Sequence, residues 1–303
     1  MDNIFQLYHE LKTLTYKHGN YQQFKINDPK SRTIHKASVR DRLLHHAVYR
    51  ILCPFFDKKF ISDSFSCRNN KGTHKALKRI ERFVRKVPQN NTMQCYILKC
   101  DIKKFFASID QNILPKILQK HISVRLSRDN QNKTIDLLKE IIVSFKPNGL
   151  PLGNLTSQLF ANVYLNELDQ FINHKLKAKH YIRYADDFVI LSQDKNCLKN
   201  LIPQVQKFLQ NELKLTLHPN KIFTKRLKLG MDFLGWINFF GYRVLRGKII
   251  KRIFKRILEN PKKETVASYL GLIKHGKTSK IKKEVIRIYE ISLTPHRDEA
   301  LDF

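Results

Sequence analysis

Apolar residues recur at two different periods along this chain, and each period predicts one kind of element. In residues 39–51 they fall at helical spacing with arginines on the other faces, which predicts a helix that ends at Cys53 and Pro54. An apolar and basic stretch predicts a second helix over residues 73–84. A third, amphipathic helix is predicted over residues 155–172, after a loop bounded by Gly149 and Gly153.

Shorter β-prone runs predict a strand and two hairpins. Residues 96–102 read as a strand that carries Asp101 at its end, and residues 181–192 read as two strands joined through Ala185, Asp186 and Asp187. Residues 233–244 predict a second hairpin. From residue 248 onward, basic residues alternate with Ile, Phe and Leu in helical patterns, which predicts a basic helical segment at the end of the chain.

The composition is that of a globular chain in a reducing setting. Its 303 residues are 42% hydrophobic, enough for one to three packed subdomains. The five cysteines are odd in number and scattered, which argues against a disulfide framework or a zinc site. No apolar run reaches the roughly 18 residues of a membrane span, and no signal-like segment opens the chain. We therefore expect a soluble, cytoplasmic protein without a membrane anchor.

The charge indicates a polyanionic partner. Lysine and arginine number 57 against 26 acidic residues, so the formal net charge is +31, and it is spread along the whole chain. Self-repulsion on this scale lowers folding stability, and phosphate groups of a nucleic acid would offset it. The alternatives are a basic surface that only keeps the protein in solution, and binding to an acidic membrane. The lysines form no single amphipathic helix of the kind that a membrane binder uses.

Three aspartates predict a magnesium site. Joining a nucleotide to a primer requires charge neutralisation at the attacking hydroxyl and at the leaving pyrophosphate, and two Mg²⁺ ions about 4 Å apart supply it. Magnesium takes oxygen ligands, mainly carboxylates. Asp101 ends one predicted strand, and Asp186 with Asp187 lies between two apolar strands. The alternative is a solvated turn, but charges between core strands are costly unless a cation offsets them.

The Tyr-Ala-Asp-Asp run at residues 184–187 resembles the signature of reverse transcriptases, and further motifs of that family follow in order over residues 39–280. The resemblance implies an α+β right-hand polymerase fold with fingers, a palm of antiparallel sheet and helices, and a helical thumb. It divides the chain into an N-terminal extension (1–38), fingers (39–95), palm with inserted fingers elements and primer grip (96–245) and basic thumb (246–303).

The resemblance also assigns residue roles. It implies that Asp101, Asp186 and Asp187 are catalytic and bind two Mg²⁺ ions together with Ile102, and that Phe106 lies under the sugar and selects deoxynucleotides. The nucleotide site would further include Arg68, Lys71, Leu152, Gly153, Gln158 and Lys221, and the primer grip would include Leu234, Gly235 and Trp236. The alternatives are surface cations for Arg68, Lys71 and Lys221, and core packing for Phe106 and Trp236.

One departure from the family pattern suggests a subtype. Most reverse transcriptases have glutamine where Leu152 stands, and an aliphatic residue there followed by Ser157 and Gln158 resembles the enzymes of diversity-generating retroelements. These copy a template-repeat RNA into cDNA with errors at adenines, for mutagenic retrohoming, and act with a small basic accessory protein. A leucine loses the amide hydrogen bonds of glutamine near the substrate, which would loosen selection. The alternative is a packing variant without consequence.

The expected substrates and partners follow from the same resemblance. They are dNTPs, a template RNA and the RNA–DNA hybrid, together with the accessory protein and possible oligomers of the chain. About 20 residues follow the last matched motif, which ends near residue 280, too few for an RNase H or endonuclease domain. The rival interpretations are a retron or phage-defence reverse transcriptase and, in a different class, a non-catalytic RNA-binding splicing or assembly factor.

Overall fold

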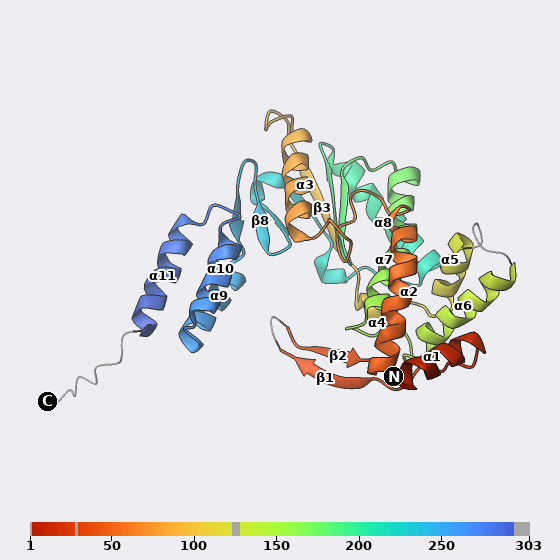
Figure 1. Cartoon of the computed structure of the whole chain (residues 1–303). Helices are drawn as coiled ribbons and strands as arrows, with labels where there is room; N and C mark the ends of the chain where they lie inside the picture. Colours follow the sequence, from red (N-terminus) through yellow and green to blue (C-terminus); the bar gives the residue numbers. More distant parts are fainter. Residues whose placement is uncertain (1, 28–29, 123–127, 294–303) are drawn as a thin grey trace. The chain divides into compact units, whose positions relative to one another are not determined.

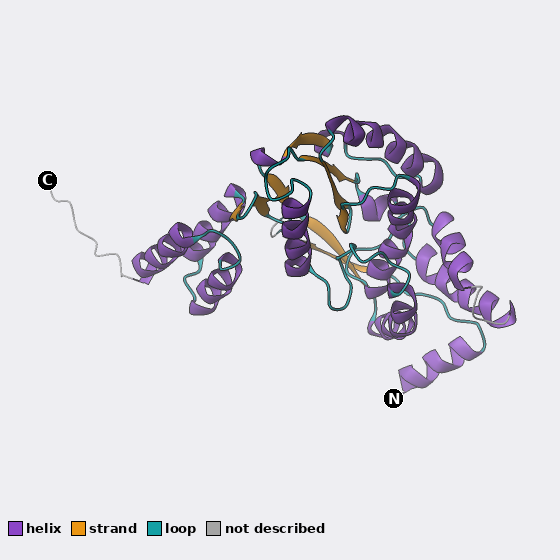
Figure 2. Ribbon diagram, turned by 90° about the horizontal axis from the view of Figure 1, so that it is seen from above, coloured by secondary structure: helices purple, strands orange, loops and turns teal. Residues whose placement is uncertain are grey.

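The computed structural model describes residues 2–27, 30–122 and 128–293, and the chain divides into two compact units (Figure 1, Figure 2). Unit 1 consists of Met1–Ala76 and Leu98–Thr224, and unit 2 consists of Leu77–Ile97 and Lys225–Phe303. The three aspartates belong to unit 1. The second predicted hairpin and the basic C-terminal helices belong to unit 2.

Unit 1 surrounds a sheet with helices. Its sheet has the strand order β4-β5-β3-β6, and a separate hairpin pairs β1 with β2. The strands are β1 (Gln22–Ile26), β2 (Arg32–Lys36), β3 (Tyr96–Asp101), β4 (Tyr181–Tyr184), β5 (Asp187–Ser192) and β6 (Phe223–Arg226). The first two residues of β3 and the last two of β6 belong to unit 2. The helices are α1 (Asp2–Lys12), α2 (Val39–Asp57), α4 (Phe105–Ser108), α5 (Ile113–Ile122), α6 (Arg128–Val143), α7 (Leu155–Gln170) with a π-helical turn η1 (Phe171–Lys175), α8 (Lys195–Leu213) and the short η2 (Pro219–Lys221).

The predicted strand and first hairpin are present. β4 and β5 pair antiparallel with Tyr184 opposite Asp187, as the two β-prone runs around the aspartates predict. The interior of β3 is buried, and only its two end residues are partly exposed. This pattern arises because β3 lies in the middle of the sheet, where both strand faces are covered.

Helix α7 is buried on nearly all sides, and the predicted amphipathic character is wrong. Twelve of its sixteen residues are buried, because α7 packs against α2, α5 and α8. Its buried polar side chains have partners inside the unit: Asn162 donates to the Ser66 carbonyl at 2.9 Å, and Asp169 accepts from Tyr181 at 2.6 Å. Satisfied polar groups allow a helix with a mixed sequence to occupy the centre of a core.

Helix α2 continues through Pro54 to Asp57, so the predicted end at Cys53 and Pro54 is wrong. Ser38 caps the start of the helix, where its Oγ accepts from the Asp41 amide at 3.1 Å. Pro54 removes one backbone donor, but it lies on the exposed face, where the carbonyl it leaves unpaired can bond to water. Packing of the opposite, apolar face keeps the last turn helical.

Unit 2 combines a small sheet with helices. The described elements are α3 (Thr73–Lys86), which begins in unit 1, the short η3 (Leu227–Leu229), β7 (Met231–Phe233), β8 (Trp236–Asn238), β9 (Arg243–Leu245), α9 (Gly247–Glu259), α10 (Lys263–Ile273) and α11 (Ser279–Leu293). The three strands form an antiparallel meander, and the predicted basic helices follow it. Trp236, Ile253 and Val285 share one hydrophobic core. No helix in the described ranges has the length and apolar character to cross a bilayer.

Candidate active site

The end of β3 and the β4–β5 turn bring the three aspartates to one edge of the sheet. Asp101 is the last residue of β3, and Ala185 and Asp186 connect β4 to β5. The Ile102 amide donates to the Asp186 carbonyl at 3.2 Å, which fixes the turn beside the strand end. Ala185 has a φ of 54°, a left-handed conformation that costs a non-glycine residue about 1–3 kcal/mol and is concentrated at functional sites.

A buried arginine forms a hydrogen bond to the backbone of this turn. Arg183 is 1% exposed and bonds to both oxygens of Asp169, at 2.7 and 2.6 Å. Its Nη1 also donates to the Ala185 carbonyl at 3.0 Å. The guanidinium therefore ties the left-handed residue of the turn to the central helix α7. The sequence analysis did not single out Arg183, although a charged residue inside an apolar strand is a usable signal for such a role.

Lysines neutralise two of the three carboxylates. Lys221 donates to Asp101 Oδ1 at 2.8 Å, and Lys99 lies 2.9 Å from Asp187 Oδ2. Lys99 and Asp101 are two positions apart on β3, so they share one face of the strand. The sequence analysis named Lys221 but missed Lys99. A lysine within an otherwise apolar strand next to a catalytic motif is the signal that would have found it.

Burial and mutual repulsion make the cluster costly to ionise. Burial raises the pKa of Asp187 to about 6, and the nearby Asp101 and Asp186 add to the rise, although Lys99 opposes it. Burial and the charge of Asp101 also raise the pKa of Asp186, while Lys221 and Arg32 lower it. Arg32 begins β2, in the segment predicted as an N-terminal extension, and was not expected near the aspartates.

The donor set suits Mg²⁺ in its chemistry. Within residues 2–27, 30–122 and 128–293, no three His, Cys, Asp or Glu side chains surround a common metal position, and Asp101 and Asp187 bond to lysines. However, Asp187 Oδ1 is buried and has no hydrogen-bond partner among the described residues. An orphaned carboxylate oxygen beside two more carboxylates is a group that a divalent cation would satisfy.

The glycine-bounded loop packs directly on the residue predicted to lie under the sugar. The Leu150 amide donates to the Phe106 carbonyl at 2.7 Å, and Phe106 itself is half-buried. Gly149 has a φ of 84°, and a Cβ there would lie 2.5 Å from that carbonyl and 2.7 Å from the Ala107 Cα. Only glycine allows this approach, so the loop and Phe106 keep a fixed relation.

The same loop also contacts the N-terminal hairpin. The His35 amide on β2 donates to the Leu152 carbonyl at 2.8 Å, and Asn154 Nδ2 donates back to the His35 carbonyl at 3.4 Å. A Cβ on Gly153 would lie 2.8 Å from Ile34 Cγ2. Leu152 and Gln158 are half-buried. The segment predicted as a mere extension therefore helps to shape the loop.

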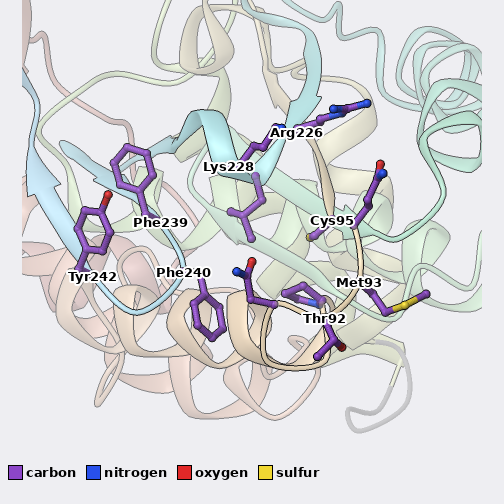
Figure 3. Close-up of a pocket in the computed structure, with 12 residues that line it drawn as sticks. Thr92, Met93, Cys95, Arg226, Lys228, Phe239, Phe240 and Tyr242 are labelled. Carbon is purple, nitrogen blue, oxygen red and sulfur yellow. The ribbon is translucent and has the colours of Figure 1, made fainter.

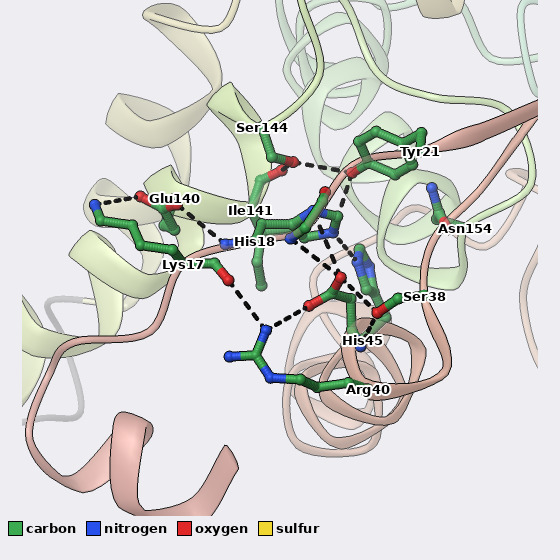
Figure 4. A network of polar contacts seen from close by, with 12 residues as sticks. Lys17, His18, Tyr21, Ser38, Arg40, His45, Glu140, Ile141, Ser144 and Asn154 are labelled. Carbon is green, nitrogen blue, oxygen red and sulfur yellow. Dashed lines mark hydrogen bonds and ion pairs between the residues drawn. The ribbon is translucent and has the colours of Figure 1, made fainter. Parts of the chain in front are cut away.

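A polar network links the first residues of the chain to the start of α7 (Figure 4). His45 on α2 is buried, with Nε2 3.0 Å from His18 Nε2, and its Nδ1 bonds to the Thr156 hydroxyl on α7. The Tyr21 hydroxyl lies 2.9 Å from the hydroxyl of Ser144, the residue that follows α6. Thr156 is four residues from Leu152, so this network anchors the helix that follows the loop.

The two cations expected to grip a triphosphate are engaged elsewhere. Arg68 bonds to Asp57 Oδ1 at 2.6 Å and to the Ile61 and Ser64 carbonyls at 2.7 and 3.0 Å. Lys71 donates to the Ser62 carbonyl at 2.7 Å. These bonds shape the segment between α2 and α3. A role in triphosphate binding stays a prediction, and it would require both side chains to exchange these partners.

The predicted primer-grip turn lies in unit 2. Leu234 and Gly235 connect β7 to β8 with positive φ angles of 53° and 84°. Trp236 is 2% exposed and Phe233 is fully buried, so both rings serve the core of this unit. Leu234 and Gly235 are half-buried, so the turn exposes mainly their backbone and part of the Leu234 side chain. Contact with a primer stays a prediction for these residues.

Comparisons with known proteins agree with the motifs. A family model described as reverse transcriptase (RNA-dependent DNA polymerase) matches residues 19–238. Protein YkfC of Escherichia coli K12 is 23% identical over 258 residues, covering 72% of this chain and 67% of that protein. The group II intron-encoded protein LtrA of Lactococcus lactis is 24% identical over 298 residues, covering 75% and 47%. The retron Ec73 reverse transcriptase of Escherichia coli is 27% identical over 193 residues, covering 60% and 56%.

Solved structures share the fold. Apo telomerase from Candida tropicalis aligns with a TM-score of 0.61 at 14% identity, covering 90% of this chain and 57% of that one. Telomerase from the same organism with the TWJ fragment of telomeric RNA aligns with a TM-score of 0.59, also at 14% identity, covering 95% and 56%. The chain thus spans about half to two thirds of the length of the relatives and structures named here. The predicted α+β polymerase fold is confirmed.

Proposed function

Because this chain belongs to the reverse transcriptase (RNA-dependent DNA polymerase) family, we propose that it copies an RNA template into cDNA at the Asp101, Asp186 and Asp187 cluster. The observation that carries the proposal is the backbone bond from Ile102 to Asp186, which gathers the three carboxylates at one sheet edge. The orphaned Oδ1 of Asp187 supports a cation-binding role for this cluster.

The residues at the cluster divide the work of nucleotide addition. Asp101, Asp186 and Asp187, with the backbone of Ile102, would hold two Mg²⁺ ions, which supply charge neutralisation at the attacking hydroxyl and the leaving pyrophosphate. Lys99 and Lys221 offset the charges of Asp187 and Asp101. Phe106, whose backbone is fixed by the loop after Gly149, would exclude a 2′-hydroxyl. Leu152, Gly153 and Gln158 would line the nucleotide site, and Leu234, Gly235 and Trp236 would form the primer grip.

Replacing Asp186 with asparagine tests the catalytic assignment. We expect Asp186→Asn to reduce primer extension on an RNA template by at least about 10³-fold, because an amide cannot replace the carboxylate charge at a metal site. Affinity for the template–primer should change little. Asp136→Asn, at an exposed aspartate on α6, is the matched control and should retain full synthesis. Loss of RNA binding in Asp186→Asn would mean that the residue is structural.

Primer extension also separates the enzyme from the rival of another class. With Mg²⁺, dNTPs and a template–primer present, a reverse transcriptase makes cDNA whose length follows the template. A splicing or assembly factor that only binds RNA makes none. A wild-type chain that binds the template–primer but never extends it, with its cognate RNA present, would contradict the enzyme assignment.

We further propose that the enzyme serves a diversity-generating retroelement, with a template-repeat RNA and a small basic accessory protein as partners. Leu152 supports this proposal, because its half-buried side chain is a hydrocarbon and offers no amide to the substrate. Loss of one or two such contacts reduces discrimination by roughly 1–3 kcal/mol, or about one to two orders of magnitude.

The subtype proposal predicts the effect of restoring the amide. Leu152→Gln should lower misincorporation at template adenines by about 10-fold or more, measured by sequencing cDNA made on a defined RNA. Ile51→Gln, at a leucine-sized residue that is 74% exposed on α2, controls for adding a glutamine elsewhere. An error spectrum that is the same in Leu152→Gln and in the wild type would sink this explanation of fidelity.

A retron enzyme is the second candidate, favoured by the similarity to the retron Ec73 reverse transcriptase. The two candidates differ in what surrounds the gene and in the product. A pair of nearby repeats that differ mainly at adenines supports the retroelement. A neighbouring structured RNA found joined to cDNA in a branched molecule supports the retron instead.

A further inference from the structure

Unit 2 contains a cavity of about 420 Å³ that none of the assignments above uses (Figure 3). It lies where the segment before β3 meets the segment after β6 and the β8–β9 connection. Its volume falls within the range of small-ligand sites. The lining residues are Pro88, Asn91, Thr92, Met93, Gln94, Cys95, Arg226, Leu227, Lys228, Phe239, Phe240 and Tyr242.

One wall of the cavity is aromatic and already arranged for stacking. Phe239 and Tyr242 lie with ring centroids 4.9 Å apart and planes 15° apart, and both are seen together in Figure 3. A bond from the Phe239 amide to the Tyr242 carbonyl, 2.9 Å long, closes the connection that carries them. Tyr242 is 48% exposed, so its ring does not belong to the core of unit 2 and is accessible to a ligand. Lys277 Nζ lies 5.5 Å from the Tyr242 ring centre.

Arg226 and Lys228 supply positive charge beside the cavity, where a phosphate group could bind. Both side chains are exposed, on either side of the buried Leu227. Neither has an ion-pair partner within the described parts of the chain, and the cavity lining includes no acidic residue. The Leu227 amide donates to the Cys95 carbonyl at 2.8 Å. This bond holds the segment of Arg226 and Lys228 against residues 91–95, which line another side of the cavity. The cations are therefore held at the rim without a counter-ion from unit 2.

A second cavity shares the same rings. It has a volume of about 430 Å³ and is also lined by Phe239 and Tyr242, to which it adds Lys274 and Lys277. Its acidic residue, Glu81, is 2.8 Å from Arg243 and is thereby neutralised. Two basic cavities that share one pair of stacked rings form a continuous surface for a chain that alternates planar and anionic groups.

We propose that these cavities bind an unpaired stretch of nucleic acid, with one base on the Phe239 and Tyr242 rings and its phosphates at Arg226 and Lys228. Proteins that hold single strands combine aromatic stacking platforms with a basic track in this way. Thr92 and Gln94 line the same space. The Thr92 hydroxyl donates to the Gln89 carbonyl and the Gln94 Oε1 accepts from the Tyr96 hydroxyl, which leaves the Gln94 Nε2 to bond a base edge. The site extends the proposed function, because it would hold a strand through unit 2 without any contribution from the aspartate cluster.

The test measures binding alone, without Mg²⁺ or dNTPs, so it is independent of whether the chain synthesises cDNA. The probe is a fluorescein-labelled adenosine decamer RNA, compared by anisotropy with a decamer whose internal bases are abasic. Tyr242→Ala should weaken binding of the intact decamer by about 5- to 100-fold and leave the abasic decamer unchanged. Tyr242→Phe, which retains the ring, should bind as the wild type does.

Two further variants separate stacking from charge and from general surface effects. Tyr8→Ala removes an exposed tyrosine of unit 1, 63% exposed, and should change neither probe. Arg226→Ala should weaken intact and abasic decamers equally and lower the salt slope by about 0.7, the contribution of one phosphate contact with a single strand. Melting curves check that each variant is folded, and ultraviolet crosslinking of a 4-thiouridine decamer should modify residues 226–242.

The source of the strand is decided by comparing an RNA decamer with a DNA decamer of the same sequence. Preference for RNA would assign the site to template, and equal or stronger DNA binding would assign it to the product strand; the stacking chemistry is the same for both. Equal affinity of Tyr242→Ala and Tyr8→Ala for the intact decamer, with crosslinks elsewhere in the chain, would overturn the proposal.

Discussion

A buried histidine in the N-terminal network gives the fold a pH dependence. Burial lowers the pKa of His45 to about 4, with His18 and His46 adding to the shift and Asp41 opposing it. In the unfolded chain the pKa is about 6.5, so the unfolded state binds the proton first as the pH falls. This group therefore removes stability progressively between about pH 6.5 and pH 4. The loss is at most about 3 kcal/mol.

We expect His45→Gln to flatten this part of the stability profile, because glutamine does not titrate. Urea unfolding at intervals from pH 4 to pH 7.5 measures it. His46→Gln, at the exposed neighbouring histidine, is the control and should keep most of the wild-type slope, because His46 is the smallest contributor to the pKa shift of His45. If the two variants show the same slope as the wild type, His45 does not titrate as its burial implies.

At the scale of single residues, the sequence identifies functional candidates when a charged residue stands where an apolar one is expected. Asp186 and Asp187 interrupt an apolar hairpin, and that interruption is visible without a structure. Lys99 is likewise visible as a lysine within an apolar strand, but its contact with Asp187 was not predictable. Lys99 is 8% exposed, whereas Lys103 and Lys104 of the same basic run are exposed, and only the sheet pairing decides which lysine faces the carboxylates. The partners of Arg68 depend likewise on how α2 and the following loop pack.

The hairpin of β1 and β2 is the element whose role departs most from the sequence-based expectation. Its strands are short and polar, so residues 22–36 lack the alternating apolar pattern that identifies strands. Its contacts to Leu152 and Gly153 are made through backbone and small groups, which leave no sequence signal. By contrast, β3 and the β4–β5 hairpin were predictable because buried strands need continuous β-prone apolar runs.

We expect the hairpin to support nucleotide binding through one backbone bond. His35→Pro removes the donor to the Leu152 carbonyl without removing a ladder bond to β1, because this amide points away from β1. It also removes the imidazole ring, whose centroid lies 4.7 Å from that of Phe145, so His35→Ala, which loses the ring and keeps the amide, is measured beside it. The apparent KM for dNTPs should rise by about 2- to 10-fold, the effect of one hydrogen bond, with template affinity unchanged. Steady-state primer extension measures the rise.

Thr33→Pro is the matched control for this prediction. Thr33 lies two residues earlier on the same strand, so its amide points the same way, but it makes no bond to residues 149–154. A proline there carries the same backbone restriction. If both prolines raise KM equally, the effect comes from strain in β2 and not from the bond to the loop.

For the whole molecule, the two compact units divide the predicted functions. The aspartates and the glycine-bounded loop belong to unit 1, and the predicted primer-grip turn and the basic helices belong to unit 2. The chain enters unit 2 at Leu77, returns at Leu98 and enters it again at Lys225. Such crossings join segments far apart in sequence, which is why periodicity predicts the elements but not the units. The fingers, palm and thumb boundaries stay a prediction.

The net charge of +31 leads to a prediction for the intact chain. Each phosphate contact with a single strand releases counterions and contributes about −0.7 to the slope of log K against log salt. About six contacts would then weaken binding roughly 300-fold between 50 and 200 mM KCl. Filter binding of a single-stranded template RNA over this range measures the slope. Potassium glutamate at equal ionic strength separates cation release from anion effects, and a flat response in both salts would show that the excess of lysine and arginine does not serve phosphate contacts.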